Sequence, residues 1–124
     1  MATKTITHEN FQATLDGADI LIVDFWASWC GPCRAFAPTF EKASEAHADV
    51  VFGKVDTEDQ QELAGFFQIR SIPTLMIFRE KVLLYNEAGA LPAPALEQLI
   101  GQVKALDMAK IHAEIAAQQD QPQA

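Results

Sequence analysis

Cysteine is scarce in this sequence, because Cys30 and Cys33 are the only two among its 124 residues. A secreted domain held together by several disulfides is therefore excluded. Basic residues are also few: nine Lys and Arg stand against 17 Asp and Glu, and the formal net charge is −8. Nucleic acid and anionic membrane surfaces attract concentrated Lys and Arg, so we expect neither as a partner.

Long apolar runs are absent as well. The first run, ADILIVDFWA, is broken by Asp24 and is much shorter than the roughly 18 residues of a membrane span. The first residues carry a single Lys and no apolar stretch ahead of a cleavage site, so no secretory signal is predicted. We expect a cytoplasmic protein, and in that compartment a permanent disulfide is not favoured.

What remains is the composition of one folded domain, with 49% apolar and 21% charged residues. Turn residues and apolar periodicity predict strands that alternate with helices, followed by an antiparallel hairpin and a final helix, which implies a mixed sheet between helices. The expected strands are 3–7, 19–27, 49–56, 73–79 and 81–89, and the expected helices are 8–17, 32–47, 58–67 and 91–106. Both sides of 19–27 are apolar, so this strand is expected to be covered on both faces.

The pattern changes after Leu106. Met108, Ile111 and Ile115 have helical spacing, and Asp107 is a plausible N-cap, so 107–118 is either a continuation of the last helix or a separate one. Residues 119–124 resemble a frayed tail. We therefore expect a domain over 1–106 and a helical extension over 107–124, whose apolar stripe packs on the domain's own surface rather than on a partner.

The stretch FWASWCGPCRAF contains both cysteines, between a buried strand and a helix. Residues three apart on a helix are neighbours, so the two thiols can form a disulfide. The positive end of the helix favours a thiolate, and Pro32 suits the first helical position. We expect Cys30 to be the exposed nucleophile that attacks a target disulfide, and Cys33 to resolve the mixed disulfide.

Two rival interpretations of the pair are weaker. A zinc site needs about four ligands, whereas the pair supplies two, and His8, His47 and His112 are scattered without paired spacing. A single-cysteine nucleophile of protease type would need a neighbouring histidine, and no histidine is marked by its context. We expect no metal.

At this point the chain closely resembles the thioredoxin family. The match runs from about residue 4 to 106 and rests on VDFWASWCGPC, KVD, IRSIPTLMIF and the GAL before the last helix. The resemblance implies a thioredoxin fold of class α/β, with a central mixed sheet of about five strands and helices on both faces. It also implies a protein-disulfide reductase that acts on client proteins as a monomer. It would bind no cofactor and would be recharged by thioredoxin reductase, a flavoprotein that uses NADPH.

The resemblance also assigns roles to residues around the pair. Asp24 lies among apolar neighbours, where desolvation raises a carboxyl pKa, and the family's buried Asp, a general base for Cys33, falls on this position. Lys54 would lie beside Asp24 and moderate its pKa. Pro73 would follow a cis bond. The rim that contacts client chains would comprise Trp29, Gly31, Pro32, Ile72, Pro73 and Gly89.

Three features depart from the family. Glu80 and Lys81 occupy the hairpin turn although neither favours positive φ, so the turn geometry is open. Ser71 replaces a common glycine, which would narrow the client groove. The extension 107–124 is additional to the fold, and it supports an alternative function: a partner-binding or chaperone-like module in which redox turnover is incidental.

Overall fold

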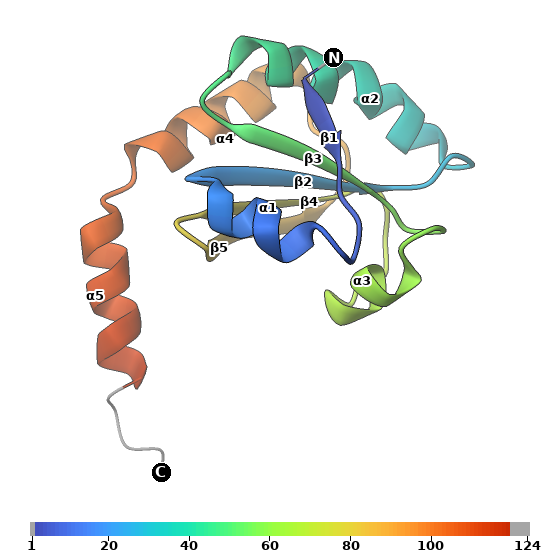
Figure 1. The fold of residues 1–124 in the computed structure, drawn as a ribbon. Helices are drawn as coiled ribbons and strands as arrows, with labels where there is room; N and C mark the ends of the chain where they lie inside the picture. Colours follow the sequence, from blue (N-terminus) through green and yellow to red (C-terminus); the bar gives the residue numbers. More distant parts are fainter. Residues whose placement is uncertain (1, 120–124) are drawn as a thin grey trace.

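The computed structural model describes residues 2–119, which form a five-stranded sheet with helices on both faces (Figure 1). The strands are β1 (Thr3–Thr5), β2 (Ile20–Trp26), β3 (Val51–Asp56), β4 (Thr74–Arg79) and β5 (Val82–Ala88), in the order β1-β3-β2-β4-β5. The first three run parallel, and β4 and β5 are each antiparallel to their neighbours. The helices are α1 (Phe11–Gly17), α2 (Gly31–Ala46), α3 (Gln61–Phe66), α4 (Ala93–Ala105) and α5 (Met108–Gln119). The predicted α/β fold with a mixed sheet is confirmed.

The central strand β2 is buried on both faces, as its doubly apolar sequence predicts. Ile20 and Ile22 belong to a core with α2 and α4, whereas Leu21 and Val23 belong to a second core with α1 and α3. Fully burying such a side chain stabilises the fold by about 1.5–3 kcal/mol. The two cores fix the position of β2, and therefore of the loop that leads from it into α2.

Two helices, α1 and α3, each begin three residues later than the sequence predicts. Residues 8–10 form a turn instead of the first turn of α1, because Asn10 and Thr7 bond each other: the Thr7 N–H donates to Asn10 Oδ1 at 2.8 Å and the Asn10 N–H to Thr7 Oγ1 at 3.3 Å. Before α3, the N–H of Glu58 donates to Oδ1 of Asp56 at 3.0 Å. In both places a short polar side chain competes for the backbone and delays the helix.

The hairpin between β4 and β5 turns at Glu80 and Lys81, whose φ angles are 49° and 69°. Positive φ at both central residues is the geometry of a type I′ turn, which suits the right-handed twist of the flanking strands. The strand pairing therefore imposes this geometry on two residues that do not favour it. A register irregularity lies nearby, between Ile77 and Phe78.

The extension forms a separate helix that projects from the sheet (Figure 1). Leu106 is extended and ends α4, and Asp107 caps α5 as predicted, since its Oδ1 accepts the N–H of Lys110 at 3.2 Å. Of the apolar stripe, Met108 is buried, while Ile111 and Ile115 are only partly buried. Packing on the domain's own surface is thus confined mainly to the start of α5.

Most of the expected frayed tail, 120–124, lies outside the described residues. Within residues 2–119, no helix combines the length and apolar character needed to cross a membrane.

Candidate active site

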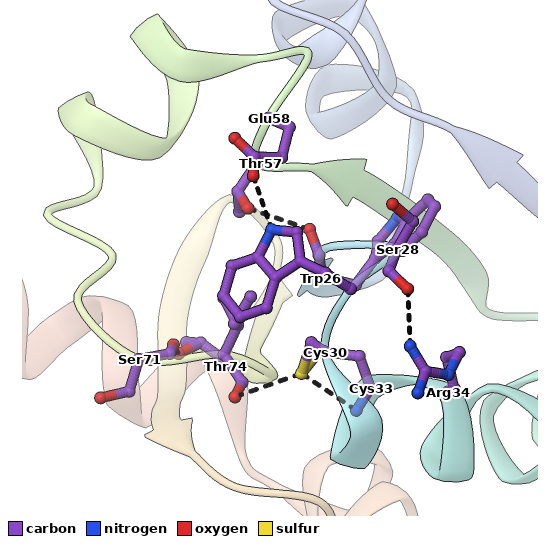
Figure 2. The surroundings of a disulfide bond; sticks show 11 residues. Trp26, Ser28, Cys30, Cys33, Arg34, Thr57, Glu58, Ser71 and Thr74 are labelled. Atoms are coloured by element: carbon purple, nitrogen blue, oxygen red, sulfur yellow. Dashed lines mark hydrogen bonds between the residues drawn. A yellow bond between two sulfur atoms is a disulfide. The ribbon is translucent and has the colours of Figure 1, made fainter.

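Cys30 and Cys33 form a disulfide at the start of α2, with their Cα atoms 5.2 Å apart (Figure 2). Cys30 is the N-cap residue, and its Sγ accepts the N–H of Cys33 at 3.2 Å. The helix begins at Gly31, so Pro32 occupies its second position rather than the first. The predicted placement of the pair between a buried strand and a helix is thus observed.

The expectation that Cys30 is exposed is wrong, because both cysteines are buried. The exposed fractions are 4% for Cys30 and 3% for Cys33, because Ala27, Trp26 and Ile72 pack around the disulfide. The two sulfurs differ instead in their environment at the start of the helix. Cys30 Sγ receives a backbone N–H at the positive end of a 16-residue helix, an environment that stabilises a thiolate.

A second segment meets the disulfide from the start of β4. The Ile72–Pro73 bond is cis, in agreement with the resemblance, and Cys30 Sγ lies 3.7 Å from the carbonyl oxygen of Ile72. The N–H of Gly89 donates to the carbonyl of Pro73 at 2.8 Å. Gly89 has a φ of +113°, which a residue with a side chain rarely adopts. Ile72, Pro73 and Gly89 are therefore brought together beside Cys30.

The side chains of Trp29 and Arg34 each donate a hydrogen bond that holds the loop before Cys30. The Trp29 indole Nε1 donates to Oε1 of Glu58 at 2.5 Å, and Arg34 Nη1 donates to the Ser28 carbonyl at 2.8 Å. Figure 2 shows Arg34 reaching back from α2 to Ser28. Trp29 is nevertheless 65% exposed, and Gly31 and Pro32 are exposed beside it.

Sequence reasoning did not identify Glu58 or Arg34 as part of this site. Glu58 lies 29 residues from its partner Trp29, in an acidic loop that has no distinguishing pattern. Arg34 resembles any surface cation on a helix until its partner Ser28 is known. No signal in a single sequence marks either contact.

Asp24 is buried in the middle of β2, with an exposed fraction of 1%. Within the described residues, neither carboxylate oxygen has a hydrogen-bond partner. Burial raises the pKa of Asp24 from 3.8 to about 7, and the positive charge of Lys54 offsets part of this rise. Lys54 pairs with Asp24 in the β2–β3 register, and its Nζ lies 4.8 Å from the ring centroid of Trp26.

The three histidines have different partners in the structure. Each pairs with a glutamate: His8 with Glu62 at 3.8 Å, His47 with Glu97 at 2.6 Å and His112 with Glu80 at 2.9 Å. Across residues 2–119, no three His, Cys, Asp or Glu side chains are grouped so that they could hold a metal ion.

Known proteins resemble this chain in sequence and in fold. The thioredoxin family model matches residues 2–102. A Streptomyces coelicolor protein named "Putative thioredoxin 2" is 52% identical over 120 residues, which cover 97% of this chain and 90% of the relative. A thioredoxin of Alicyclobacillus acidocaldarius is 42% identical over 103 residues, covering 82% of this chain and 98% of the relative.

Solved structures agree with the sequence matches. A Plasmodium falciparum thioredoxin superposes with a TM-score of 0.75 at 34% identity, covering 81% of this chain and 98% of that one. The chloroplastic thioredoxin z gives a TM-score of 0.78 at 31% identity, with coverage of 86% and 97%. Together with the disulfide at the start of α2, these matches establish that the chain belongs to the thioredoxin family of protein-disulfide oxidoreductases.

Proposed function

We propose that this oxidoreductase works as a reductase of client-protein disulfides. The Cys30 thiolate attacks one client sulfur, so that a mixed disulfide forms and the other client sulfur leaves as a thiolate. Cys33 then attacks Cys30 Sγ, which releases the second client thiol and leaves the Cys30–Cys33 disulfide. Two electrons pass from the pair to the client. The observation that carries this proposal is the N–H of Cys33 on Cys30 Sγ at the start of α2.

Asp24 is the proposed general base for the second step. The Cys33 thiol must lose its proton before it attacks, and a base is most effective when its pKa lies near the working pH. Burial supports this role, because it raises the pKa of Asp24 to about 7. Lys54 is a positioning residue in this scheme, since its charge lowers the pKa of the carboxyl toward the working range.

The apolar rim around the pair is the proposed contact surface for client chains. It combines the exposed Trp29, Gly31 and Pro32 with the segment that contains the cis bond, and its full set is Trp29, Gly31, Pro32, Ile72, Pro73 and Gly89. An extended client segment can pair with exposed backbone at such an edge while its cysteine faces Cys30.

Family membership supports a proposal for the remaining steps. We infer that the oxidised pair is reduced again by a flavoprotein thioredoxin reductase with electrons from NADPH, in the cytoplasm, and that the chain acts as a monomer without a bound cofactor. A thioredoxin reductase and disulfide-containing clients are therefore the partners that we expect.

The reduction potential of the Cys30–Cys33 pair tests the proposed direction of electron flow. Equilibration against defined dithiol buffers should give a potential close to that of thioredoxins, about −270 mV. A potential near that of protein disulfide isomerase, about −180 mV, would contradict the reductase function, because such a pair would accept electrons rather than donate them. The two values are easily distinguished, since 30 mV already corresponds to about 1.4 kcal/mol for a two-electron couple. The same protein should also reduce a peptide disulfide in a single turnover.

A second candidate function is a partner-binding module that uses the extension. The observation that favours it is α5, which projects from the sheet and buries little of its apolar stripe beyond Met108 (Figure 1). Removal of residues 107–124 separates the two functions, because only the binding module depends on them.

A further inference from the structure

An apolar groove lies between α1 and α3, away from the disulfide. It has a volume of about 380 Å³, and its apolar lining consists of Phe11, Leu63 and Phe66. Phe66 is 77% exposed, the largest value among the exposed large apolar side chains of the described residues. An exposed aromatic side chain beside a groove can serve as an anchor for a partner, because aromatic residues are enriched among those that dominate binding energy.

Phe66 contacts one other aromatic ring. Its centroid lies 5.0 Å from that of Phe67 with the ring planes at 87°, and Phe67 in turn contacts Phe11 at 5.3 Å. Edge-to-face pairs of this kind are favourable in themselves. Three aromatic rings, those of Phe11, Phe67 and Phe66, are therefore linked by edge-to-face contacts at the groove.

An acidic pocket of about 350 Å³ adjoins the groove, because His8 and Glu62 line both. Its other charged residues are Glu9, Glu58 and Asp59, and none of its lining residues is Lys or Arg. The single cationic candidate, His8, already faces Glu62 at 3.8 Å. The pocket thus offers a negative surface next to an apolar one.

The acidic pocket is continuous with the redox site. Glu58 lines the pocket and also accepts the indole N–H of Trp29, the residue before Cys30. From Cys30 the surface therefore runs over Trp29 to the carboxylates and on to Phe66. A chain whose cysteine lies at Cys30 can follow this path.

We propose that the α1–α3 groove is a second docking site for client proteins, and that it takes an apolar side chain from a client segment that also carries Lys or Arg beside its reactive cysteine. This inference rests on the proposed function, since the client's disulfide lies at Cys30. Charge complementarity selects the basic segment. It also disfavours a second copy of this chain, whose net charge of −8 would meet the acidic pocket with like charge.

The test uses the full chain and synthetic peptides that contain one cysteine as a glutathione disulfide. A short peptide has only glycine and serine around the cysteine. Extended peptides carry Lys-Arg next to the cysteine and a Leu beyond it. These residues are placed on either the N-terminal or the C-terminal side of the cysteine, with spacers of several lengths. A control set of extended peptides has Glu-Glu in place of Lys-Arg. Single-turnover rate constants are measured with the reduced protein by acid quench and chromatography.

We expect at least one extended basic peptide to react about tenfold faster than the short peptide, and we expect Phe66→Ala to abolish this advantage while leaving the short peptide unchanged. Leu83→Ala, which removes another exposed apolar side chain, should change neither rate constant. Glu62→Gln and added salt should slow the extended basic peptide alone.

The inference would be overturned if the native chain reduced the short peptide and all extended peptides with equal rate constants. It would also be overturned if the Glu-Glu peptides reacted as much faster than the short peptide as the Lys-Arg peptides do. A native dimer in sedimentation that Phe66→Ala dissociates would also overturn it, in favour of a second copy in the groove. Failure to reduce even the short peptide would contradict the proposed function instead. In that case, binding of an extended peptide with serine in place of cysteine, compared between native and Phe66→Ala chains, still decides whether the groove is a docking site.

Discussion

Asp24 and Lys54 stand opposite each other in the β2–β3 register, yet the charge of Lys54 offsets only part of the effect of burying Asp24. The Lys54 ammonium lies over the Trp26 ring, and the Asp24 carboxylate accepts no hydrogen bond within the described residues. A buried carboxylate without partners destabilises the folded state whenever it is ionised. The proposed base is thus held at a pKa of about 7 by a local loss of stability.

Replacing Asp24 by Asn should therefore stabilise the oxidised protein, and the gain should depend on pH. Below pH 4 the carboxyl is protonated in both the folded and the unfolded state, and the two proteins differ little. Between pH 4 and 7 only the folded state keeps the proton, so the stability of the native chain falls as the pH rises. The gain of Asp24→Asn should grow to at most about 4 kcal/mol and level off above pH 7, since each pH unit contributes about 1.4 kcal/mol.

Urea unfolding at several pH values measures this difference, and Asp49→Asn is the control. The pKa of Asp49 is lowered, first by the hydrogen bond from Lys104, so that any stability it contributes is present above its ordinary pKa and is lost as the pH falls. The stability difference between native and Asp49→Asn proteins should therefore change with pH in the direction opposite to that for Asp24→Asn. Stability curves of native and Asp24→Asn proteins that run parallel from pH 4 to 8 would show that Asp24 titrates normally.

The two cysteines should behave differently when they are replaced one at a time. Cys33→Ser leaves the sulfur that accepts the backbone N–H, so the protein should attack a client disulfide and accumulate the mixed disulfide. Cys30→Ser should form none. Non-reducing electrophoresis after incubation with a peptide disulfide measures both. Mixed disulfide on Cys33 in the Cys30→Ser protein would reverse the assigned roles.

Asp24→Asn should slow only the second step. The rate at which Cys33 resolves a preformed mixed disulfide should fall by up to about 100-fold at neutral pH, because the proton acceptor is lost. Attack by Cys30 on the client should be unchanged, which rapid-quench kinetics can separate. Equal slowing of both steps would indicate a structural role for Asp24 rather than a base.

Two glycines should respond oppositely to alanine. A Cβ at Gly53 on β3 would lie 2.7 Å from Cγ1 of the buried Ile6 and closer still to its Cδ1, so Gly53→Ala should destabilise the fold by about 1–3 kcal/mol. A Cβ at Gly101 inside α4 meets nothing within 4 Å. Gly101→Ala should stabilise the fold by about 0.5–1 kcal/mol. Denaturant unfolding of both variants tests the contrast, and a neutral Gly53→Ala would mean that Ile6 can move aside.

The sequence predicts the parts of the site that depend on local pattern. The apolar residues on both sides of β2 place it at the centre of the sheet, and the two cysteines after it coincide with the start of α2. Positions that depend on distant partners are not predictable in this way. The burial of Cys30 is one of these, because Ile72, which helps to bury it, comes from a segment 42 residues away.

The hairpin shows the same limit. Glu80 and Lys81 have no preference for positive φ, and the geometry follows from the pairing of β4 with β5. Arg79, just before the turn, gave no signal in the sequence. Its Nη1 donates to three carbonyl oxygens at the end of α4, those of Val103 at 2.9 Å and of Lys104 and Leu106 at 3.1 Å.

Arg79→Met should consequently lower the free energy of unfolding by about 2 kcal/mol, since it removes charge-assisted hydrogen bonds to the end of a helix. Arg70→Met is the matched control, because Arg70 is exposed, and it should change stability by less than about 0.5 kcal/mol. Urea unfolding measures both. A loss of equal size in the two variants would mean that the contacts of Arg79 with α4 contribute nothing specific.

Removal of residues 107–124 tests both the domain boundary and the second candidate function. The described contacts of α5 with the domain are few: Met108 is buried, and His112 Nε2 lies 2.9 Å from Oε1 of Glu80. The truncated chain should therefore stay folded and lose about 2–3 kcal/mol, most of it from Met108, while His112→Ala in the full chain loses less than about 1 kcal/mol. Reduction of a short peptide disulfide should be unchanged, because no residue of the site lies beyond 106. A truncated chain that fails to fold would place the boundary of the domain after α5, whereas normal peptide reduction with lost capture of protein partners would support the binding module.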